Sequence, residues 1–387
     1  MSGGVDSSVA ASMLLRDGWD VVGVFMRLGS PGGVASAEAD EHVASTESPD
    51  RASNASSAAT NGTACSPSGK SKQGCCSVLD AADARRVAGL LDIPFYVLNF
   101  QDDFGKVIDY FVSEYNRGRT PNPCVRCNDW LKFGKLARYA EAVGASHVAS
   151  GHYARVGHDA LLNEKVLMRG LDHRKDQSYV LFGMKRQTLE HTLLPVGDFD
   201  KAHVRTLAET WNLPVFNKPD SQEICFVPNQ DYAGLVKRRS PDTFRTGELV
   251  TIGGQAIGTH EGHQHFTIGQ RKGAGVAVGY PIYVVDIDPV ENRVTMGPKD
   301  ALFKSRLEAS QTNWISSRIH QAGGSMRCQA KIRYNHQPVD GTVTITGNDT
   351  LSLTFDVPQT AITPGQAVVC YDGDIVLGGG WIDRAIA

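Results

Sequence analysis

The chain has 387 residues, and its 39 Lys and Arg against 42 Asp and Glu give a formal net charge of −3. This length exceeds one average domain, and a hydrophobic content of 41% is typical of globular proteins. A wholly disordered chain, a collagen and a coiled coil are therefore excluded. The near-neutral charge balance excludes a polycationic mode of nucleic-acid binding but permits a local basic groove.

The sequence contains no apolar run long enough for a membrane-spanning helix, and its first residues lack the pattern of a secretory signal. We therefore expect a cytoplasmic protein with no membrane partner. The eight cysteines are too sparse for a disulfide framework in a chain of this length. In a reducing compartment, a Cys-x-x-Cys motif instead indicates redox, metal or catalytic chemistry.

The first half of the chain alternates between helical and strand patterns. Apolar spacing and end signals predict helices and strands in this order: helix 7–16, strand 21–26, helix 80–91, strand 95–100, helix 104–115, helix 129–143 and strand 147–150. Alternation of this kind predicts βαβ units in a parallel sheet that is covered on both faces.

Residues 30–74 interrupt this alternation, because the segment contains no aromatic residue, no Leu and no Ile. Such a composition buries too little apolar area to offset the entropy lost on ordering, so we expect a disordered surface insertion.

Beyond Phe226, Gly and Pro separate short β-rich runs. This texture predicts a small antiparallel barrel or sandwich. The expected domains are an α/β domain over residues 1–221, a small Gly-rich domain over 222–283 and a β-rich domain over 284–387.

The segment before the first predicted helix is SGGVDSS, residues 2–8. Two adjacent glycines allow backbone N–H groups to approach a ligand, the serine hydroxyls add donors, and the helix N-terminus adds a positive dipole. The segment is therefore a candidate phosphate cradle, although it is no Walker A loop because no Gly-Lys-Ser/Thr follows. Asp6 suits an anion site if Mg²⁺ bridges it to phosphate. The structural alternative is a Gly-rich turn that caps a helix.

This string resembles the PP-loop of the ATP-pyrophosphatase superfamily, whose members cleave ATP between the α and β phosphates and adenylate an oxygen. The resemblance implies adenylation rather than phosphoryl transfer, and by itself it leaves the substrate open.

Two cysteines lie in GRTPNPCVRCN, residues 118–128, where two prolines stiffen the connection between two predicted helices. Cys124 and Cys127 thus precede a helix expected to begin near Asp129, and a helix N-terminus raises the thiolate fraction of a nearby cysteine. Arg126 and Lys132 add to this effect. The alternative is a structural zinc half-site that Cys75 and Cys76 could complete. Cys225 lies in the polar stretch DSQEICF, residues 220–226, where the alternative is an ordinary buried thiol.

Taken together, these strings resemble one family, the tRNA-specific 2-thiouridylases, which replace O2 of the wobble uridine with sulfur. The resemblance covers nearly the whole chain outside residues 30–74. The segments that carry it are residues 2–8, residues 118–128, GHYAR at 151–155, KDQSY at 175–179, DSQEICF at 220–226 and KIRY at 331–334.

The resemblance implies an N-terminal PP-loop domain with a parallel sheet, a central tRNA-binding domain and a C-terminal antiparallel β-barrel. It also implies ATP-dependent 2-thiolation of the wobble uridine, in which adenylation of O2 makes AMP the leaving group. Cys225 would carry a persulfide, and Cys127 would be the nucleophile that frees its sulfur and closes a disulfide with Cys225. The implied partners are tRNAs of the Lys, Glu and Gln type and a sulfur donor, either a cysteine desulfurase or a relay carrier. ATP and Mg²⁺ are the implied cofactors.

The resemblance further assigns binding residues, in three groups. Those expected to bind ATP are Ser2, Gly3, Gly4, Val5, Asp6, Ser7, Met26 and Gly151. Those expected to contact the target base, which must leave its stack for chemistry, are Asn122, Pro123 and Cys124. Those expected to contact the rest of the tRNA are His152, Lys175, Asp176, Gln177, Arg333, Tyr334 and Gln366. The ordinary alternatives are a solvated turn for residues 175–177 and a strand-surface charge for Arg333.

The chain departs from the family pattern at two places. Family members usually carry an apolar strand before the loop, whereas Met1 stands directly before it here, so we expect a central strand to be missing. Many members also carry Asp where this chain has Cys124. Together with Cys127 and Cys225, this residue makes three thiols that could hold a [4Fe–4S] cluster with one open iron for sulfide. The persulfide route is the first interpretation, and the cluster is the alternative.

Two further alternatives come from other functional classes. Another PP-loop adenylating ligase, such as an amidotransferase or a lysidine-type synthetase, would not need the cysteine pair. A non-catalytic RNA-binding or metal-storage protein would not need the loop.

Overall fold

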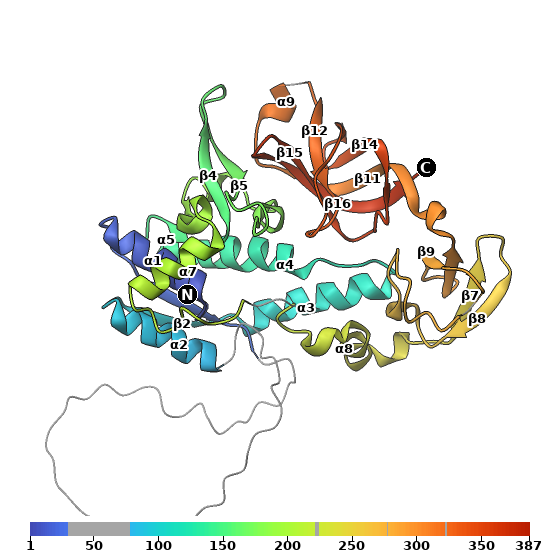
Figure 1. The fold of residues 1–387 in the computed structure, drawn as a ribbon, viewed down its shortest axis with the longest axis horizontal. Helices are drawn as coiled ribbons and strands as arrows, with labels where there is room; N and C mark the ends of the chain where they lie inside the picture. Colours follow the sequence, from blue (N-terminus) through green and yellow to red (C-terminus); the bar gives the residue numbers. More distant parts are fainter. Residues whose placement is uncertain (30–77, 221–223, 277, 322) are drawn as a thin grey trace, which may run out of the picture.

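The computed structural model describes residues 1–29, 78–220, 224–276, 278–321 and 323–387 (Figure 1). The insertion expected at residues 30–74 lies outside this part of the chain, as do Cys65, Cys75 and Cys76. Three regions follow one another: an α/β region, a small mixed sheet and a β-barrel, as the sequence predicts. None of the helices in the described segments is long and apolar enough to cross a membrane.

The N-terminal region begins with alternating helices and strands. In chain order they are α1 (Val5–Arg16), β1 (Gly23–Arg27), α2 (Val78–Leu90), β2 (Phe95–Asn99) and α3 (Gln101–Asn116). β1 and β2 pair in parallel, which confirms the βαβ interpretation of this part. Helical spacing on α3 brings Phe104, Val107 and Phe111 to one buried face. This face forms one wall of an apolar cluster that also contains Phe226.

A second parallel pair consists of β3 (Val148–Ala149) and β6 (Thr192–Leu193). The single parallel sheet expected from the pattern is therefore corrected: in the described part of the N-terminal region, the four strands that pair in parallel form two separate pairs. β3 is only two residues long, and its pairing partner is β6 rather than β1 or β2.

The helix expected from residue 129 begins earlier, at Pro123. It runs through α4 (Pro123–Arg126), a π-helical stretch (Cys127–Lys135) and α5 (Leu136–Ala142). Proline suits the first helical position, and the Asn122 side chain accepts a hydrogen bond from the Val125 amide at 3.4 Å. Cys124 and Cys127 therefore belong to the helix itself, which corrects their predicted position before it.

The hairpin of β4 (Ala154–Asp159) and β5 (Glu164–Arg169) lies next to the barrel in Figure 1. β5 pairs with barrel strand β16 (Ile375–Ile386) at Met168 and Ile375, which extends the sheet of the barrel into the N-terminal region. The short helix α6 (Arg186–Leu189) precedes β6, and α7 (Lys201–Thr210) packs against α1.

The central region contains α8 (Tyr232–Arg239) and a four-stranded sheet. Its strands are β7 (Gly247–Thr251), β8 (Ala256–His260), β9 (Tyr283–Asp288) and β10 (Arg293–Gly297), in the order β8-β7-β10-β9. The expected boundary between residues 283 and 284 falls inside β9. Residues 284–297 thus belong to this sheet rather than to the barrel, because β10 pairs with β7 on one side and with β9 on the other.

The C-terminal region is an antiparallel barrel. It consists of β11 (Phe303–Trp314), β12 (Ser325–Lys331), β13 (Val339–Gly347), β14 (Thr350–Thr360), β15 (Ala367–Asp372) and β16, with the short helix α9 (Arg318–Gln321) after β11. The order β11-β14-β13-β12-β15-β16 closes through pairing of β11 with β16. Alternate residues such as Leu351, Leu353 and Phe355 point into its core. A barrel, rather than a sandwich, is confirmed.

Candidate functional site

The Gly-rich loop enters α1 through Gly3 and Gly4. Gly3 has a φ of +70°, and a Cβ at this position would lie 2.2 Å from the carbonyl oxygen of Asp80 on α2. Both the backbone conformation and the close approach of α2 therefore require glycine. The Ser2 amide donates to Ser7 Oγ at 3.1 Å, which folds the loop over the first turn of α1. Gly4 is the N-cap and has no side chain to cover the first-turn N–H groups.

Gly151, which follows β3, lies against the same loop. A Cβ on Gly151 would lie 2.6 Å from the Asp6 carbonyl carbon and 2.6 Å from the Ser7 amide nitrogen. The structure thus brings Gly151 to residues 2–8, with which the resemblance groups it. Met26 lies near the end of β1 and packs, partly buried, on the apolar cluster that contains Phe104 and Phe111.

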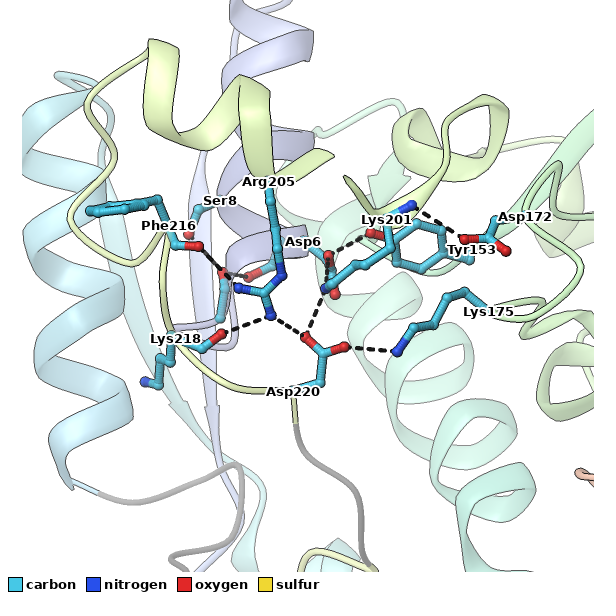
Figure 2. A network of polar contacts seen from close by, with 12 residues as sticks. Asp6, Ser8, Tyr153, Asp172, Lys175, Lys201, Arg205, Phe216, Lys218 and Asp220 are labelled. Atoms are coloured by element: carbon cyan, nitrogen blue, oxygen red, sulfur yellow. Dashed lines mark hydrogen bonds and ion pairs between the residues drawn. The ribbon is translucent and has the colours of Figure 1, made fainter. Parts of the chain in front are cut away.

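A network of charged groups surrounds Asp6 (Figure 2). Lys201 Nζ lies 2.6 Å from Asp6 Oδ1 and 2.9 Å from Asp220 Oδ1. Lys175 and Arg205 each place a nitrogen 3.0 Å from an Asp220 carboxylate oxygen. Although burial opposes it, hydrogen bonds from Lys201 and Lys175 lower the pKa of the Asp220 carboxyl, so Asp220 is ionised at neutral pH.

The Tyr153 hydroxyl donates to Asp6 Oδ1 at 2.8 Å. Burial and the neighbouring Asp6 raise the pKa of Tyr153, so its hydroxyl keeps its proton and remains a donor. Sequence reasoning assigned the loop but missed Tyr153, Lys201 and Arg205 as members of this network. Tyr153 lies within the motif at 151–155, whereas no local pattern marks the two basic residues.

Lys218 ties the loop to α2. Its Nζ lies 2.9 Å from the Gly3 carbonyl oxygen, 2.7 Å from Asp80 Oδ1 and 2.6 Å from Asp83 Oδ2. Against the effect of burial, these carboxylates raise the pKa of Lys218, which keeps its ammonium charged. In the sequence, the one feature that points to Lys218 is its position two residues before the motif at 220–226.

The three cysteines of interest differ in their surroundings. Cys124 is exposed, and Cys127 and Cys225 are half-buried. Cys127 and Cys225, which are far apart in the sequence, pack against the same apolar cluster around Phe104. Cys127 is the first residue of the π-helical stretch, a form of helix that is frequent at functional sites.

The barrel contacts the segment that carries these cysteines. Gln366 Nε2 donates to the carbonyl oxygens of Thr120 and Pro121 at 3.0 and 3.1 Å. The Arg126 guanidinium carbon lies 4.0 Å from the centre of the Trp381 ring of β16. The position of the cysteines therefore depends on the C-terminal region as well as on the N-terminal one.

Family models match all three regions of the chain. The tRNA methyl transferase HUP domain matches residues 1–61 and 32–229, the tRNA methyl transferase PRC-barrel domain matches 235–298, and the aminomethyltransferase beta-barrel domain matches 304–382. A protein of Rhodopirellula baltica named tRNA-specific 2-thiouridylase MnmA is 48% identical over 100% of this chain and 96% of its own length. The chain belongs to the tRNA-specific 2-thiouridylase family.

Two further 2-thiouridylases agree with this assignment. The proteins named tRNA-specific 2-thiouridylase MnmA in Clostridioides difficile and Carboxydothermus hydrogenoformans are each 43% identical over 100% of this chain and 97% of their own length. The family resemblance predicted from the motifs is thereby confirmed.

Among the residues that the 2-thiouridylase resemblance assigns to the base, Pro123 is buried and Asn122 is half-buried. Asn122 caps α4, so its side-chain oxygen Oδ1 already accepts a hydrogen bond from the Val125 amide. Cys124 is the exposed member of this group.

Several residues that the resemblance assigns to tRNA have partners within the protein. His152 is buried with Nδ1 2.6 Å from Ser150 Oγ, and burial together with Lys132 lowers the pKa of this imidazole. Asp176 is buried and accepts from the Gly170 amide at 3.1 Å. Gln177 Oε1 accepts from the Tyr153 amide at 2.9 Å.

The remaining members of that group lie nearer the surface. Arg333 is half-buried, with Nη1 3.5 Å from the Ala361 carbonyl oxygen, and the Tyr334 side chain is 37% exposed. Lys175 is engaged by Asp220 near the loop. Contact of these residues with tRNA stays a prediction.

In the described segments, no three His, Cys, Asp or Glu side chains gather closely enough to hold a metal ion. Cys124, Cys127 and Cys225, the predicted cluster ligands, are therefore not assembled around one point in this structure. As they stand, they do not fit a [4Fe–4S] cluster.

Proposed function

We propose that this chain catalyses ATP-dependent 2-thiolation of the wobble uridine of tRNA. The observation that carries the proposal is the apolar cluster around Phe104. Met26, predicted to bind ATP, and the two predicted catalytic residues, Cys127 and Cys225, all pack against it. This packing supports the proposal, because a residue expected to bind ATP and the two residues expected to transfer sulfur contact one cluster, in a member of the 2-thiouridylase family.

The first step of the proposed reaction activates an inert oxygen. The C2 carbonyl of uridine belongs to a urea-like group, so a sulfur nucleophile does not displace its oxygen directly. O2 attacks the α-phosphorus of ATP, pyrophosphate leaves, and N3 gives up its proton. The loop at residues 2–8, with Gly151 against it, offers backbone N–H groups and hydroxyls to the phosphates of ATP, which enters as its Mg²⁺ complex.

The second step transfers sulfur through the cysteine pair. Cys225 receives a persulfide from a donor protein, a cysteine desulfurase or a relay carrier. The Cys127 thiolate attacks Sγ of Cys225, which breaks the persulfide bond, releases hydrosulfide and forms a disulfide between the two cysteines. Hydrosulfide attacks C2 and AMP leaves. An external thiol supplies two electrons that reopen the disulfide.

The exposed Cys124 and the neighbouring Asn122 and Pro123 are the proposed contacts of the flipped-out base. Tyr334 and Arg333 are the proposed contacts of the tRNA that lie nearest the surface. The proposed substrates are tRNAs of the Lys, Glu and Gln type.

Reconstitution with ATP, Mg²⁺, tRNA, a sulfur donor and a thiol reductant tests the proposal. Digestion of the tRNA and mass analysis of its nucleosides should show 2-thiouridine at the wobble position. Cys127→Ser and Cys225→Ser should abolish the product. Unchanged uridine under both aerobic and anaerobic conditions would refute the proposal, and an active Cys127→Ser variant would favour another adenylating ligase. Binding of tRNA without release of AMP or pyrophosphate would favour a non-catalytic protein.

Cys124→Asp separates the two sulfur routes. In the persulfide route this variant carries the residue common in the family and should thiolate tRNA without iron. In the cluster alternative it removes a thiolate ligand, so activity should depend on Cys124 and on anaerobic reconstitution with iron.

A further inference from the structure

The loop at residues 2–8 contains no Lys and no Arg, and its single charged side chain is the carboxylate of Asp6. Hydrogen bonds from amides and hydroxyls satisfy only part of the charge of a triphosphate, and protein phosphate sites usually add a cation. If ATP binds here, as the proposed function requires, another segment of the chain has to supply that cation.

We propose that Lys201 is the phosphate-binding cation of this site and that it exchanges the Asp6 carboxylate for a phosphate oxygen when ATP binds. Lys201 is the first residue of α7, whose start is fixed by the Asp200 side chain accepting from the His203 amide at 2.7 Å. From this position its side chain crosses to the first turn of α1 (Figure 2). The residue is far from the loop in the sequence but reaches it in the fold.

The surroundings of Lys201 make its charge available to a ligand. Its side chain is only 10% exposed, and its Nζ lies 5.5 Å from the centre of the Tyr153 ring. Water therefore screens this ammonium less than it screens a surface lysine. A phosphate oxygen that reached the loop would meet a nearly buried cation.

Lys201 is the cation that links the loop to this network. Lys201, Lys175 and Arg205 share Asp220, and of these three cations Lys201 alone also contacts Asp6. Asp172, a third carboxylate of the network, accepts from the backbone amide of Lys201 at 3.3 Å, so it leaves the ammonium group to the other two. Among the three cations, Lys201 is therefore the one placed to meet a phosphate on the loop.

Release of Lys201 would leave both carboxylates with partners. Asp220 would keep Lys175 and Arg205 at 3.0 Å, and Asp6 would keep the Tyr153 hydroxyl at 2.8 Å. Movement of Lys201 to a phosphate would thus not strand a buried charge, which is the usual obstacle to breaking such a pair. Lys218 differs, because its three oxygen partners belong to the loop backbone and to α2. We assign it to positioning the loop.

An acyl-phosphate derivative of ATP tests the proposal on the unmodified full-length protein. A lysine amine near the terminal phosphate attacks the acyl carbon, forms an amide and releases ATP. Peptide mass spectrometry should find the acyl group on Lys201, and excess ATP should suppress this labelling. The exposed Lys299 serves as the control, and its background labelling should not respond to ATP. Absence of ATP-sensitive acylation at Lys201 would overturn the proposal.

Equilibrium dialysis with the variants provides a second readout. Lys201→Met should weaken ATP binding about 10- to 100-fold, the size of one charge-assisted contact, while adenosine binding stays unchanged. Lys201→Arg should recover part of the loss, and Lys299→Met should bind as the parent does. Unchanged ATP affinity in a folded Lys201→Met variant would contradict the inference.

The two proposals fail in different ways. If the parent protein binds no ATP, both the adenylation step and the role of Lys201 are refuted. If the parent binds ATP and thiolates tRNA while Lys201 is neither labelled nor needed for ATP affinity, only the role of Lys201 is refuted.

Discussion

The guanidinium carbon of Arg126 lies 4.0 Å from the centre of the Trp381 ring, which joins α4 to barrel strand β16. Arg126 also lies near the rings of Tyr110 and Trp130, and its Nη2 donates to Gln311 Oε1 of β11 at 2.6 Å. Because Arg126 stands between Cys124 and Cys127, this contact links the barrel to the helix that carries the proposed nucleophile.

Arg126→Met should therefore loosen that helix. Loss of a desolvated cation–π contact is expected to lower the free energy of unfolding by about 1–2 kcal/mol. Thiolation should slow, and alkylation of Cys127 by iodoacetamide should change in rate. The exposed Arg327 is the control, and Arg327→Met should leave both rates unchanged. Equal behaviour of the two variants would show that the Trp381 contact does not position the cysteines.

Gln366→Ala tests a residue for which two roles compete. The resemblance assigns Gln366 to tRNA, whereas its side chain donates to the carbonyl oxygens of Thr120 and Pro121. Each hydrogen bond contributes about 1 kcal/mol to the free energy of unfolding, so the segment before Cys124 should become mobile. We expect slower thiolation with little change in tRNA affinity. A large loss of tRNA affinity at an unchanged maximal rate would support the tRNA contact instead.

Gly3→Ala should disable the loop. The φ of +70° is strained for alanine, and the new Cβ would lie 2.2 Å from the Asp80 carbonyl oxygen. Strain alone costs about 1 kcal/mol, and the clash adds to it. Gly18→Ala is the matched control, because its φ is +85° and no atom lies within 4 Å of the added Cβ. ATP binding, measured by dialysis, should fall in Gly3→Ala and persist in Gly18→Ala. Loss in both variants would contradict a specific role for the loop.

His336 should make the fold sensitive to acid. Burial, with the nearby Arg333 and Lys331, lowers the pKa of His336 to about 4, against 6.5 for the free side chain. Below pH 6.5 the unfolded chain takes up a proton that the folded chain does not, so stability falls as pH drops from about 6.5 to about 4. His336→Asn should reduce the fall in the free energy of unfolding, measured with urea, over this range; part of the fall remains because burial also lowers the pKa of His152. His173→Asn, at an exposed site, should retain the slope of the parent. An unchanged slope in His336→Asn would contradict this cause.

Local pattern was sufficient to predict much of the fold. The apolar stripe of α3 and the alternating strands of the barrel each depend on residues close in sequence, so their periodicity marks them directly. The early start of the helix at Pro123 does not follow from apolar spacing, because spacing marks a helix only from its first periodic position, whereas the cap at Asn122 decides where this helix begins.

The candidate site was predictable only where its residues form compact motifs. The loop at residues 2–8 and the cysteine segments are recognisable as strings. Lys201 lies 195 residues from Asp6, and only the packing of α7 against α1 brings the two together. The pairing of β5 with β16 likewise depends on a contact between distant segments, for which a single sequence carries no periodic signal.

The most direct test of sulfur transfer is a single turnover with persulfidated protein, ATP, Mg²⁺ and tRNA in the absence of reductant. Nucleoside and peptide masses are then measured on the same sample. The proposed chemistry predicts that 2-thiouridine and a disulfide between Cys127 and Cys225 appear in equal amounts. Formation of 2-thiouridine while both thiols remain free would contradict it.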